Sequence, residues 1–263
     1  FSATVPKSIA GLAKRYQNNA MRITTKEEEK QHIDIEYQAM TIAPNDRDNA
    51  IINILRYHEA QNAIIFCGTR AAVNLMKSRL TNRGFAVVAL SGELSQSERS
   101  NALQSLRDGR ARVCVATDVA ARGIDLPGLE LVIHADLPQN RDILLHRSGR
   151  TGRAGSKGVS ALIVPHNLRS KAERLLNNAK INASWKKPPS IEDIAKRDHE
   201  RFLSDPTLVE PMKDDEKEAV DKLLGAYGPE QIAAALLRTH NAQRPAPEEL
   251  LDFTPPAKHD KKN

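Results

Sequence analysis

The stretch AIIFCGTRAAVNLMKSRL, at residues 63–80, decides the fold of this chain. It opens with a short apolar run, and such runs are typical of strands that are buried on both faces of a parallel sheet. A helix-like pattern starts at Arg70, after Gly68 and Thr69, and is expected to reach residue 83. The stretch therefore predicts a buried strand that leads through small polar residues into a helix.

The same alternation continues on both sides of this stretch. We expect strands at residues 33–40, 63–67, 86–90, 112–116, 130–135 and 159–164. Helix-like patterns occupy residues 46–58, 70–83, 95–107, 140–149 and 166–180. Strands and helices that take turns predict an α/β domain, a parallel sheet with helices on both faces. Functional residues of such sheets lie just beyond the carboxyl ends of the strands. Those positions here are Gly68, Thr69, Arg70, Ser91, Gly92, Thr117 and Asp118.

The bulk properties favour one α/β core with a small appendage, since the chain has 263 residues and is 40% hydrophobic. No apolar run reaches the roughly 18 residues of a membrane-spanning helix, and no signal peptide is recognisable. Cys67 and Cys114 lie in apolar runs without His or Cys at metal-ligand spacing. We therefore expect reduced core cysteines, no metal site, no membrane contact and a cytoplasmic protein.

The charge of the chain is divided unevenly. The formal net charge is +6, but residues 191–263 hold 11 Lys and Arg against 16 Asp and Glu, whereas residues 1–190 hold 28 against 17. A basic body is typical of a protein with a polyanionic partner, most simply nucleic acid. A basic protein without such a partner would have the same composition.

The most specific motif is HRSGRTGRAG, at residues 146–155. Its glycines could indicate a dinucleotide-binding loop, but such a loop follows a strand and opens a helix, whereas this one precedes a strand. Arginines set closely in a turn of small residues can approach a phosphate chain, and the guanidinium group matches phosphate oxygens well. The alternative is that they only solvate the end of a helix.

HRSGRTGR resembles motif VI of the DEAD-box helicases, whose usual form is HRIGRTGR. The leading His-Arg pair distinguishes this family from related helicases, which carry Gln there. Leu144 stands where the family usually has Tyr, and Ser148 where it has Ile. These differences affect the packing behind motif VI rather than its charge.

Other motifs follow in the order of the same family, over about residues 1–170. Ser2, Ala3 and Thr4 resemble motif III, AIIFCGTR (63–70) motif IV, Gln96 and Arg99 the QxxR pair, and ATDVAARGID (116–125) motif V. No GxxxxGKT loop and no DEAD sequence occur. The chain begins at Phe1, so we interpret it as the second RecA-like domain of a longer polypeptide whose first domain lies upstream.

The resemblance implies roles in ATP hydrolysis. Arg150 and Arg153 would be arginine fingers that reach ATP and Mg²⁺ held mainly by the first domain, and their spacing would let a helical turn present both. Asp125 and Gly123 would contact the nucleotide, and His146 would couple it to RNA. Asp125 could instead cap the turn toward Pro127, and the role of Arg122 stays open.

The resemblance also implies an RNA site that contacts phosphate and sugar rather than bases. Its expected residues are Gly68, Thr69, Gln96, Arg99, Thr117 and Arg147. Only 4% of the residues are aromatic, which favours binding independent of RNA sequence. Gln96 and Arg99 also fit an ordinary helix face with Ser95 as its N-cap. The expected function is the C-terminal half of an RNA-stimulated ATPase that unwinds short duplexes. The alternatives are a binding and dimerisation module without chemistry, or a DNA helicase.

The chain divides into five regions on this interpretation. They are the end of motif III with a linker (1–30), the second RecA-like domain (31–185), a linker and helix (186–204), a helical region (205–245) and a flexible tail (246–263). SWKKPPS, at 184–190, indicates a linker, in which Trp185 either stacks on a base or packs on its own domain. Helices are expected at 191–204, 214–227 and 229–240.

The last two of these helices each have one apolar face, which three short helices cannot bury among themselves. The residues expected to form this surface are Val220, Leu223, Leu224, Tyr227, Ile232, Leu236 and Leu237. It either docks on the RecA-like domain or meets a second copy. The region loosely resembles the dimerisation extension of bacterial cold-shock helicases of the CsdA type, so a homodimer is expected.

Overall fold

The computed structural model describes residues 15–16, 34–122, 126, 128–153 and 155–251. These residues form one parallel sheet with the strand order β3-β4-β2-β5-β6-β1-β7. The strands are β1 (Ile35–Ile42), β2 (Ala63–Phe66), β3 (Val87–Leu90), β4 (Val113–Ala116), β5 (Leu131–His134), β6 (Gly158–Pro165) and β7 (Ser184–Lys186). Because the strands are parallel, their carboxyl ends all lie at one end of the sheet.

The helices alternate with the strands, as the sequence predicts. They are α2 (Arg47–His58), α3 (Arg70–Asn82), α4 (Gln96–Arg107), α5 (Arg141–Ser148), α6 (Arg169–Asn178), α7 (Ile191–Leu203), α8 (Lys217–Ala226) and α9 (Pro229–Ala242). Short 3-10 helices occur at η1 (Pro44–Asp46), η2 (His166–Leu168) and η3 (Pro206–Leu208). Side-chain N-caps start several helices: Thr69 caps α3, Ser95 caps α4, Asn140 caps α5 and Ser190 caps α7.

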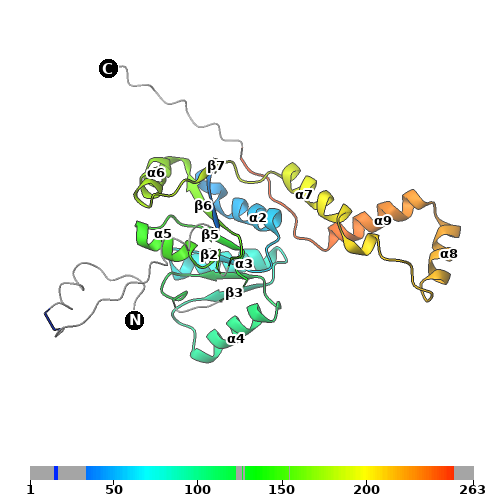
Figure 1. The fold of residues 1–263 in the computed structure, drawn as a ribbon, viewed down its shortest axis with the longest axis horizontal. Coiled ribbons are helices and arrows are strands. Elements are labelled where there is room, and N and C mark those ends of the chain that lie inside the picture. The colour runs from blue at the N-terminus through cyan, green and yellow to red at the C-terminus, as the bar shows by residue number, and fades with distance from the viewer. Residues whose placement is uncertain (1–14, 17–33, 123–125, 127, 154, 252–263) are drawn as a thin grey trace, which may run out of the picture.

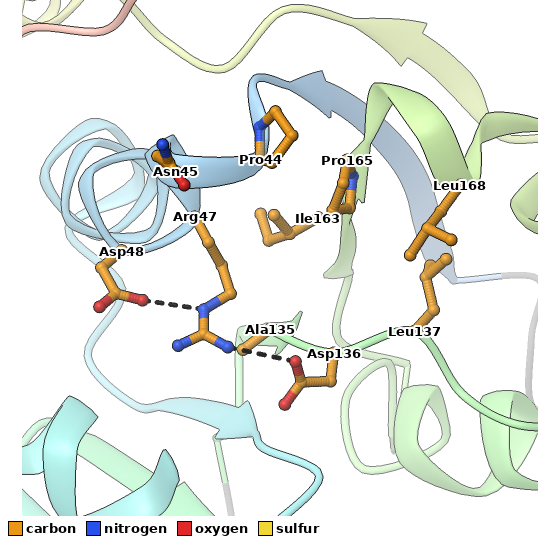
Figure 2. Close-up of a pocket in the computed structure, with 10 residues that line it drawn as sticks. All are labelled: Pro44, Asn45, Arg47, Asp48, Ala135, Asp136, Leu137, Ile163, Pro165 and Leu168. Atoms are coloured by element: carbon orange, nitrogen blue, oxygen red, sulfur yellow. Dashed lines mark hydrogen bonds and ion pairs between the residues drawn. The ribbon is translucent and has the colours of Figure 1, made fainter.

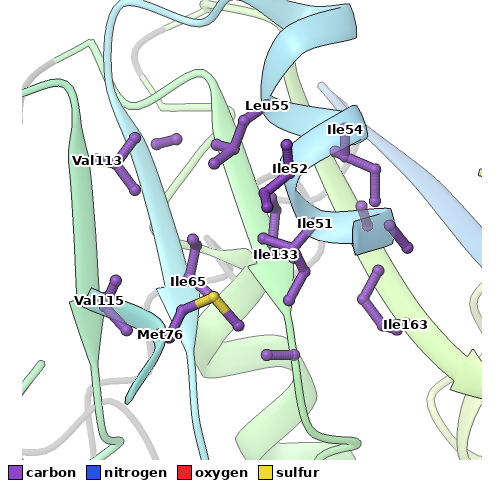
Figure 3. Packing of buried hydrophobic residues seen from close by; sticks show 14 of the residues in the cluster. Ile51, Ile52, Ile54, Leu55, Ile65, Met76, Val113, Val115, Ile133 and Ile163 are labelled. Carbon is purple, nitrogen blue, oxygen red and sulfur yellow. The ribbon is translucent and has the colours of Figure 1, made fainter. Parts of the chain in front are cut away.

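Each face of the sheet has its own hydrophobic core. On one face, α2 and α3 cover alternate residues of the central strands, such as Ile65, Val115 and Ile133, which pack near Ile51 and Met76 (Figure 3). The other face is divided between a cluster under α4 and a cluster under α5 and α6. This confirms the predicted α/β fold, a RecA-like sheet with helices on both faces.

One strand of the sheet was not predicted from the sequence. Ser184–Lys186 was expected to be part of a linker, but it forms β7 at the edge of the sheet, where Trp185 pairs with Ala39 of β1. The guanidinium of Arg169 lies over the indole ring, 4.5 Å from its centroid, and Trp185 also packs on the cluster under α6. Trp185 therefore packs on its own domain, the second of the two alternatives.

The three predicted helices after the sheet are present. The last two, α8 and α9, leave the body, by which we mean the sheet and the helices packed on it. α7 begins beside α2, and α8 and α9 project away from the sheet (Figure 1). We call Ser204–Gln243 the arm. No residue of α8 or α9 is buried, and Phe202 meets His240 edge-on near the base of the arm, with ring centroids 5.0 Å apart.

After the arm, the chain returns to the body. Residues 245–251, which we call the strap, lie against α2: the amide of Glu248 donates to Asn53, and the amide of Leu251 donates to Asp46. Leu250 packs on the core cluster beneath α2 and α3. Residues 246–251 belong to the segment expected to be a flexible tail, and this part of it contacts the body; residues 252–263 lie outside the described part of the chain.

Candidate nucleotide and RNA interface at the carboxyl ends of the strands

The loop after β2 exposes Gly68 and Thr69 at the carboxyl end of the sheet. The Thr69 hydroxyl accepts a hydrogen bond from the Ala72 amide at 3.1 Å and so caps α3. The Gly68 amide donates to the Asp136 carboxylate at 2.7 Å. A Cβ at Gly68 would lie 3.4 Å from that carboxylate, in ordinary van der Waals contact.

The segment after β4 is held by a buried arginine. Arg147, on α5, forms two hydrogen bonds with Asp118, at 2.6 and 2.7 Å, and a third with the Asp136 carbonyl at 2.9 Å. Its guanidinium also lies 5.1 Å from the ring centroid of Phe66. Arg147 is only 3% exposed, so its guanidinium faces the interior, where it joins motifs V and VI. A contact between Arg147 and RNA stays a prediction, and this geometry does not present the side chain for one.

The QxxR pair lies at the start of α4, where Ser95 and Glu98 form a capping box. Gln96 is exposed. Arg99 donates to the carbonyls of Ala120, at 2.6 Å, and Arg122, at 3.0 Å. The guanidinium of Arg99 thus supports the backbone of motif V. α4 is a capped helix, and an RNA contact by Gln96 or Arg99 stays a prediction.

Thr117 begins the motif V loop and is half-buried, and its hydroxyl accepts from the Ala120 amide at 3.4 Å. The structure therefore brings Thr117, Arg99 and the Gly68–Thr69 loop to the same end of the sheet. The proposed RNA residues are small, polar and near exposed backbone, which suits phosphate and sugar contacts.

Motif VI continues past α5 into a turn. The helix ends at Ser148, so Arg150 and Arg153 do not lie on the regular helical turn that their spacing suggested. The Arg150 guanidinium lies 2.7 Å from His146 Nε2, and the Arg153 Nε donates to the Gly149 carbonyl at 2.8 Å. Each arginine thus folds back over the preceding turn, and both remain at the surface.

His146 is held as a neutral ring beside these arginines. Partial burial lowers its pKa, and the nearby Arg150 charge lowers it further. A neutral imidazole can accept the hydrogen bond from Arg150 at Nε2, which a protonated ring could not do. His146 therefore positions Arg150 at neutral pH.

The strand after motif VI approaches the turn closely. A Cβ at Gly158 would overlap the Thr151 side chain and lie 2.7 Å from the Gly152 amide. Gly152 has a φ of +64°, in the left-handed region that glycine adopts without strain. The Thr151 hydroxyl donates to the Leu129 carbonyl. We call residues 149–153, which include Arg150 and Arg153, the arginine turn. The two glycines let β6 pack closely against this turn and fix its position.

Behind motif VI, both departures from the usual family sequence are fully buried. Leu144 packs in the cluster under α5 and α6. The Ser148 hydroxyl lies 2.9 Å from Ser160 Oγ and 3.4 Å from His134 Nε2. Ser148 therefore occupies a small polar cluster in the sheet where an isoleucine would need apolar neighbours, and this satisfies its hydroxyl.

One site residue was missed by the sequence analysis. Asp136 follows β5, accepts from the Gly68 amide, and lies 3.2 Å from Arg47, which also pairs with Asp48 (Figure 2). Because its carbonyl accepts from Arg147, Asp136 connects motif IV to motif VI. Its position just beyond a strand's carboxyl end was the available signal.

Several predicted site residues lie outside the described residues. These are Ser2, Ala3, Thr4, Gly123 and Asp125. Arg122 is described and exposed, and its carbonyl accepts from Arg99. Over the described ranges, no group of three or more His, Cys, Asp or Glu could hold a metal ion. In the same ranges, no helix has the length and apolar content needed to cross a membrane.

Comparisons with known proteins show which family the chain resembles. Residues 46–155 match the model of the family described as the helicase conserved C-terminal domain. The chain is 32% identical over 249 residues to the DEAD-box ATP-dependent RNA helicase 3B, chloroplastic, of Zea mays, a match that covers 93% of this chain and 33% of the relative. This chain spans between about a third and a half of the length of the curated relatives that it matches.

Solved structures are similar in both fold and sequence. A crystal structure of the E. coli DEAD-box protein SrmB, bound to the regulator of ribonuclease activity A, is 33% identical with a TM-score of 0.53. That match covers 60% of this chain and 93% of SrmB's. S. cerevisiae Dbp5 bound to RNA and ADP BeF3 is 27% identical with a TM-score of 0.65, over 74% of this chain and 52% of Dbp5's.

The parallel sheet, with arginines in the turn after α5 and a Gly-Thr loop after β2, defines a RecA-like C-terminal helicase domain. The sequence identities to named helicases show which family within this class the chain belongs to. The chain belongs to the DEAD-box helicase family, and its α/β body is the C-terminal helicase domain.

Proposed function

We propose that this chain is the C-terminal half of an ATP-dependent RNA helicase. It binds the RNA backbone and supplies Arg150 and Arg153 to ATP held, with Mg²⁺, mainly by a first RecA-like domain. When bound, ATP supplies the phosphoryl group that is transferred to water. The relatives' names and the Dbp5 complex with RNA and ADP BeF3 support this proposal.

The observation that carries the proposal is the arginine turn itself. His146 and the Gly149 carbonyl hold Arg150 and Arg153 at the surface, and Gly158 fixes the turn against β6. Guanidinium groups that are oriented in advance stabilise the charge that develops on a transferring phosphoryl group without reorganising during the reaction. The donor chemistry of this turn therefore fits a polyphosphate.

RNA binding is proposed for the neighbouring loops. The Gly68–Thr69 loop exposes backbone and a hydroxyl, and Thr117 begins the motif V loop that Arg99 supports. Contacts of this type recognise the sugar-phosphate chain, so we expect affinity that is independent of sequence and falls steeply with salt.

Hydrolysis in the two-domain protein tests the proposal. Arg150→Ala or Arg153→Ala should lower the rate of RNA-stimulated ATP hydrolysis by roughly a thousandfold, with RNA binding largely retained, because an arginine finger acts on the transition state. Arg141→Ala, at an exposed position at the start of α5, is the matched control.

Two results would contradict this assignment. Equal losses of hydrolysis and RNA affinity in either variant would show that these arginines hold RNA. RNA-stimulated hydrolysis by the pure 263-residue chain would show that it needs no first domain, although it contains no GxxxxGKT sequence.

We further propose that the arm forms a homodimer, for which its exposed apolar surface is the supporting observation. Leu223, Leu224, Tyr227 and Leu236 are each between 47% and 57% exposed, and Val220, Ile232 and Leu237 are half-buried beside them. Covering a large apolar side chain contributes about 1.5 to 3 kcal/mol, and a twofold contact lets each surface meet its equivalent.

The oligomeric state tests the dimer. Leu223→Asp combined with Leu236→Asp should give monomers by light scattering and leave the melting of the α/β body unchanged. Leu75→Asp, at an exposed leucine on α3, should leave the oligomeric state unchanged. A wild-type chain that scatters as a monomer at tens of micromolar would refute dimerisation.

We also propose that the protein is cytoplasmic. Cys67 and Cys114 are both free and buried, and burial raises the pKa of each thiol to about 12. Such thiols behave as small core residues, which suits a reducing compartment.

A further inference from the structure

The strap is recognised mainly through its backbone. The side-chain amide of Asn53 donates to the Glu248 carbonyl at 2.9 Å, and its oxygen accepts from the Glu248 amide at 2.7 Å. Asp46 accepts from the Leu251 amide at 2.8 Å, and Arg56 donates to the Pro245 carbonyl. Paired contacts to one residue's amide and carbonyl are the pattern that a strand uses to bind an extended peptide.

The residues that make these contacts form a polar stripe along α2 that starts at its N-cap. Asp46, the N-cap, and Asn49, Asn53 and Arg56 of the helix recur at intervals of three and four residues, which places them on one side of α2. Asn53 is fully buried and Arg56 is 4% exposed. Buried polar groups cost stability unless they are hydrogen-bonded. Asn53 also donates to the Pro189 carbonyl at 3.0 Å, and Arg56 also pairs with Glu59 and Asp198, so the strap supplies part of the hydrogen bonding that this stripe requires.

Two side chains of the strap add selectivity. The Glu248 carboxylate pairs with Arg83 at 2.6 Å, and Glu248 is more buried in this pair than Arg83. Leu250 packs against the core cluster that α2 and α3 cover. An acidic residue followed two positions later by a leucine is therefore the side-chain pattern that this surface fits.

The strap also lines a cavity next to α2. Its last described residues, Glu249, Leu250 and Leu251, line a cavity of about 320 Å³. The opposite walls come from the end of β1 and the start of α7, including Ile42 and Ile191. The surface on α2 therefore continues beyond Leu251 into a partly apolar cavity.

We infer that the polar stripe of α2, with Arg83 and the adjoining cavity, is a docking site for an extended acidic peptide. Its resident occupant is the strap of the same chain. The occupant is held by backbone hydrogen bonds at Glu248 and Leu251, one ion pair and one leucine, and none of these requires the arm. The site therefore binds the same segment when it is supplied as a separate peptide.

Hydrogen exchange in the full-length chain tests the backbone contacts. Asn53→Ala removes both bonds to Glu248, together with one bond to the Pro189 carbonyl, and should speed exchange of the Glu248 amide by about tenfold or more. Asn49→Ala is the matched control, because Asn49 lies on the same stripe and donates only one long bond, 3.4 Å, to the Glu249 carbonyl. Unchanged exchange at Glu248 in Asn53→Ala would overturn the inference.

A peptide titration tests the docking site independently. Leu250→Asp should release the strap and leave the stripe intact. A labelled peptide with the sequence RPAPEELL, residues 244–251, should then bind this variant saturably by fluorescence anisotropy. The same peptide should bind the wild-type chain at least tenfold more weakly, because the site is occupied.

Two controls test whether Glu248 of the peptide and Asn53 of the stripe determine binding. The peptide carrying Glu248→Lys, and the chain carrying both Leu250→Asp and Asn53→Ala, should each lose at least tenfold in affinity. Equal binding to all of these chains and peptides, or no binding to a Leu250→Asp chain that melts like wild type, would overturn the inference.

Discussion

The arginine turn of the body and the arm both present side chains at the surface, but they reach that state differently. In the body, Arg147 is buried, pairs with the partly exposed Asp118 and holds its neighbours in place. In the arm, Lys222 and Glu218 form an ion pair in which both side chains are more than 70% exposed. In the body, buried residues hold the exposed groups in position. In the arm, neither α8 nor α9 has a buried residue that could do so.

This difference shows that the same amphipathic spacing can have opposite outcomes. The apolar face of α2 is covered by the sheet, so Ile51 and Ile54 are fully buried. The apolar face of α9 has the same periodicity, but Leu236 is 48% exposed. Periodicity predicts that a face needs covering and does not identify the surface that covers it.

The largest difference between the two regions is expected for their ion pairs. Arg147→Met should lower the free energy of unfolding by about 3 kcal/mol, because it removes all three hydrogen bonds of a buried guanidinium group. Lys222→Met in the arm should cause no measurable change. Urea denaturation of both variants measures the contrast, and similar losses would mean that the arm is as tightly packed as the body.

A second contrast concerns glycine. Gly158→Ala should destabilise the body by about 2 kcal/mol, because the new methyl group overlaps Thr151 and crowds the arginine turn. Gly225→Ala in α8 meets nothing within 4 Å and should stabilise that helix by about 0.5 to 1 kcal/mol. Thermal melting tests the first variant, and hydrogen exchange within α8 tests the second. A stabilising Gly158→Ala would show that β6 does not confine the turn.

The smallest contrast is in the response to acid. Burial, and then the charge of Lys186, lowers the pKa of His58 from its usual 6.5 to about 4. An unfolded chain binds this proton near pH 6.5 and the folded chain does not, so stability present above that pH is lost as the pH falls toward 4. His58→Gln should reduce the fall in melting temperature between pH 7 and 4.5. His199→Gln, at an exposed position of α7, should melt like wild type at every pH.

Burial of a second histidine limits how much of this response His58 can explain. His134 is fully buried in the sheet, and burial holds its pKa well below the usual value, so it adds to the loss of stability in acid. The His58→Gln profile should therefore be shallower than that of wild type but not flat. Identical profiles for the two proteins would assign the acid response to other groups.

Most of the fold could be predicted from the sequence because local patterns determine it. Each buried strand is a continuous apolar run, and Thr69, Ser95 and Ser190 mark helix starts. The strand β7 could not be predicted in this way. Its three residues lie beside two prolines, and its strand conformation depends on pairing with Gln38, Ala39 and Met40 of β1, which are distant in sequence.

The functional site, too, could be predicted only in part from local sequence patterns. Motif VI indicates which side chains carry charge, but not that Arg147 points inward while Arg150 stays at the surface. Burial depends on Asp118 and Asp136 from other loops, so it follows from the tertiary structure. The strap was missed for a related reason: a proline-containing acidic segment resembles a flexible tail, and its partners recognise backbone atoms that every sequence has.

The arm leaves and rejoins the body at one point. Arg56 pairs with Asp198 of α7 at 2.7 Å and also binds the Pro245 carbonyl, while Arg244 reaches Asp198 at 2.9 Å. The arm is thus an insertion, and the segments just before and just after it are bound to each other at the surface of the body. Insertions of this kind can change in length or sequence without disturbing their host. The arm can therefore diversify among relatives while the helicase domain and its strap stay the same.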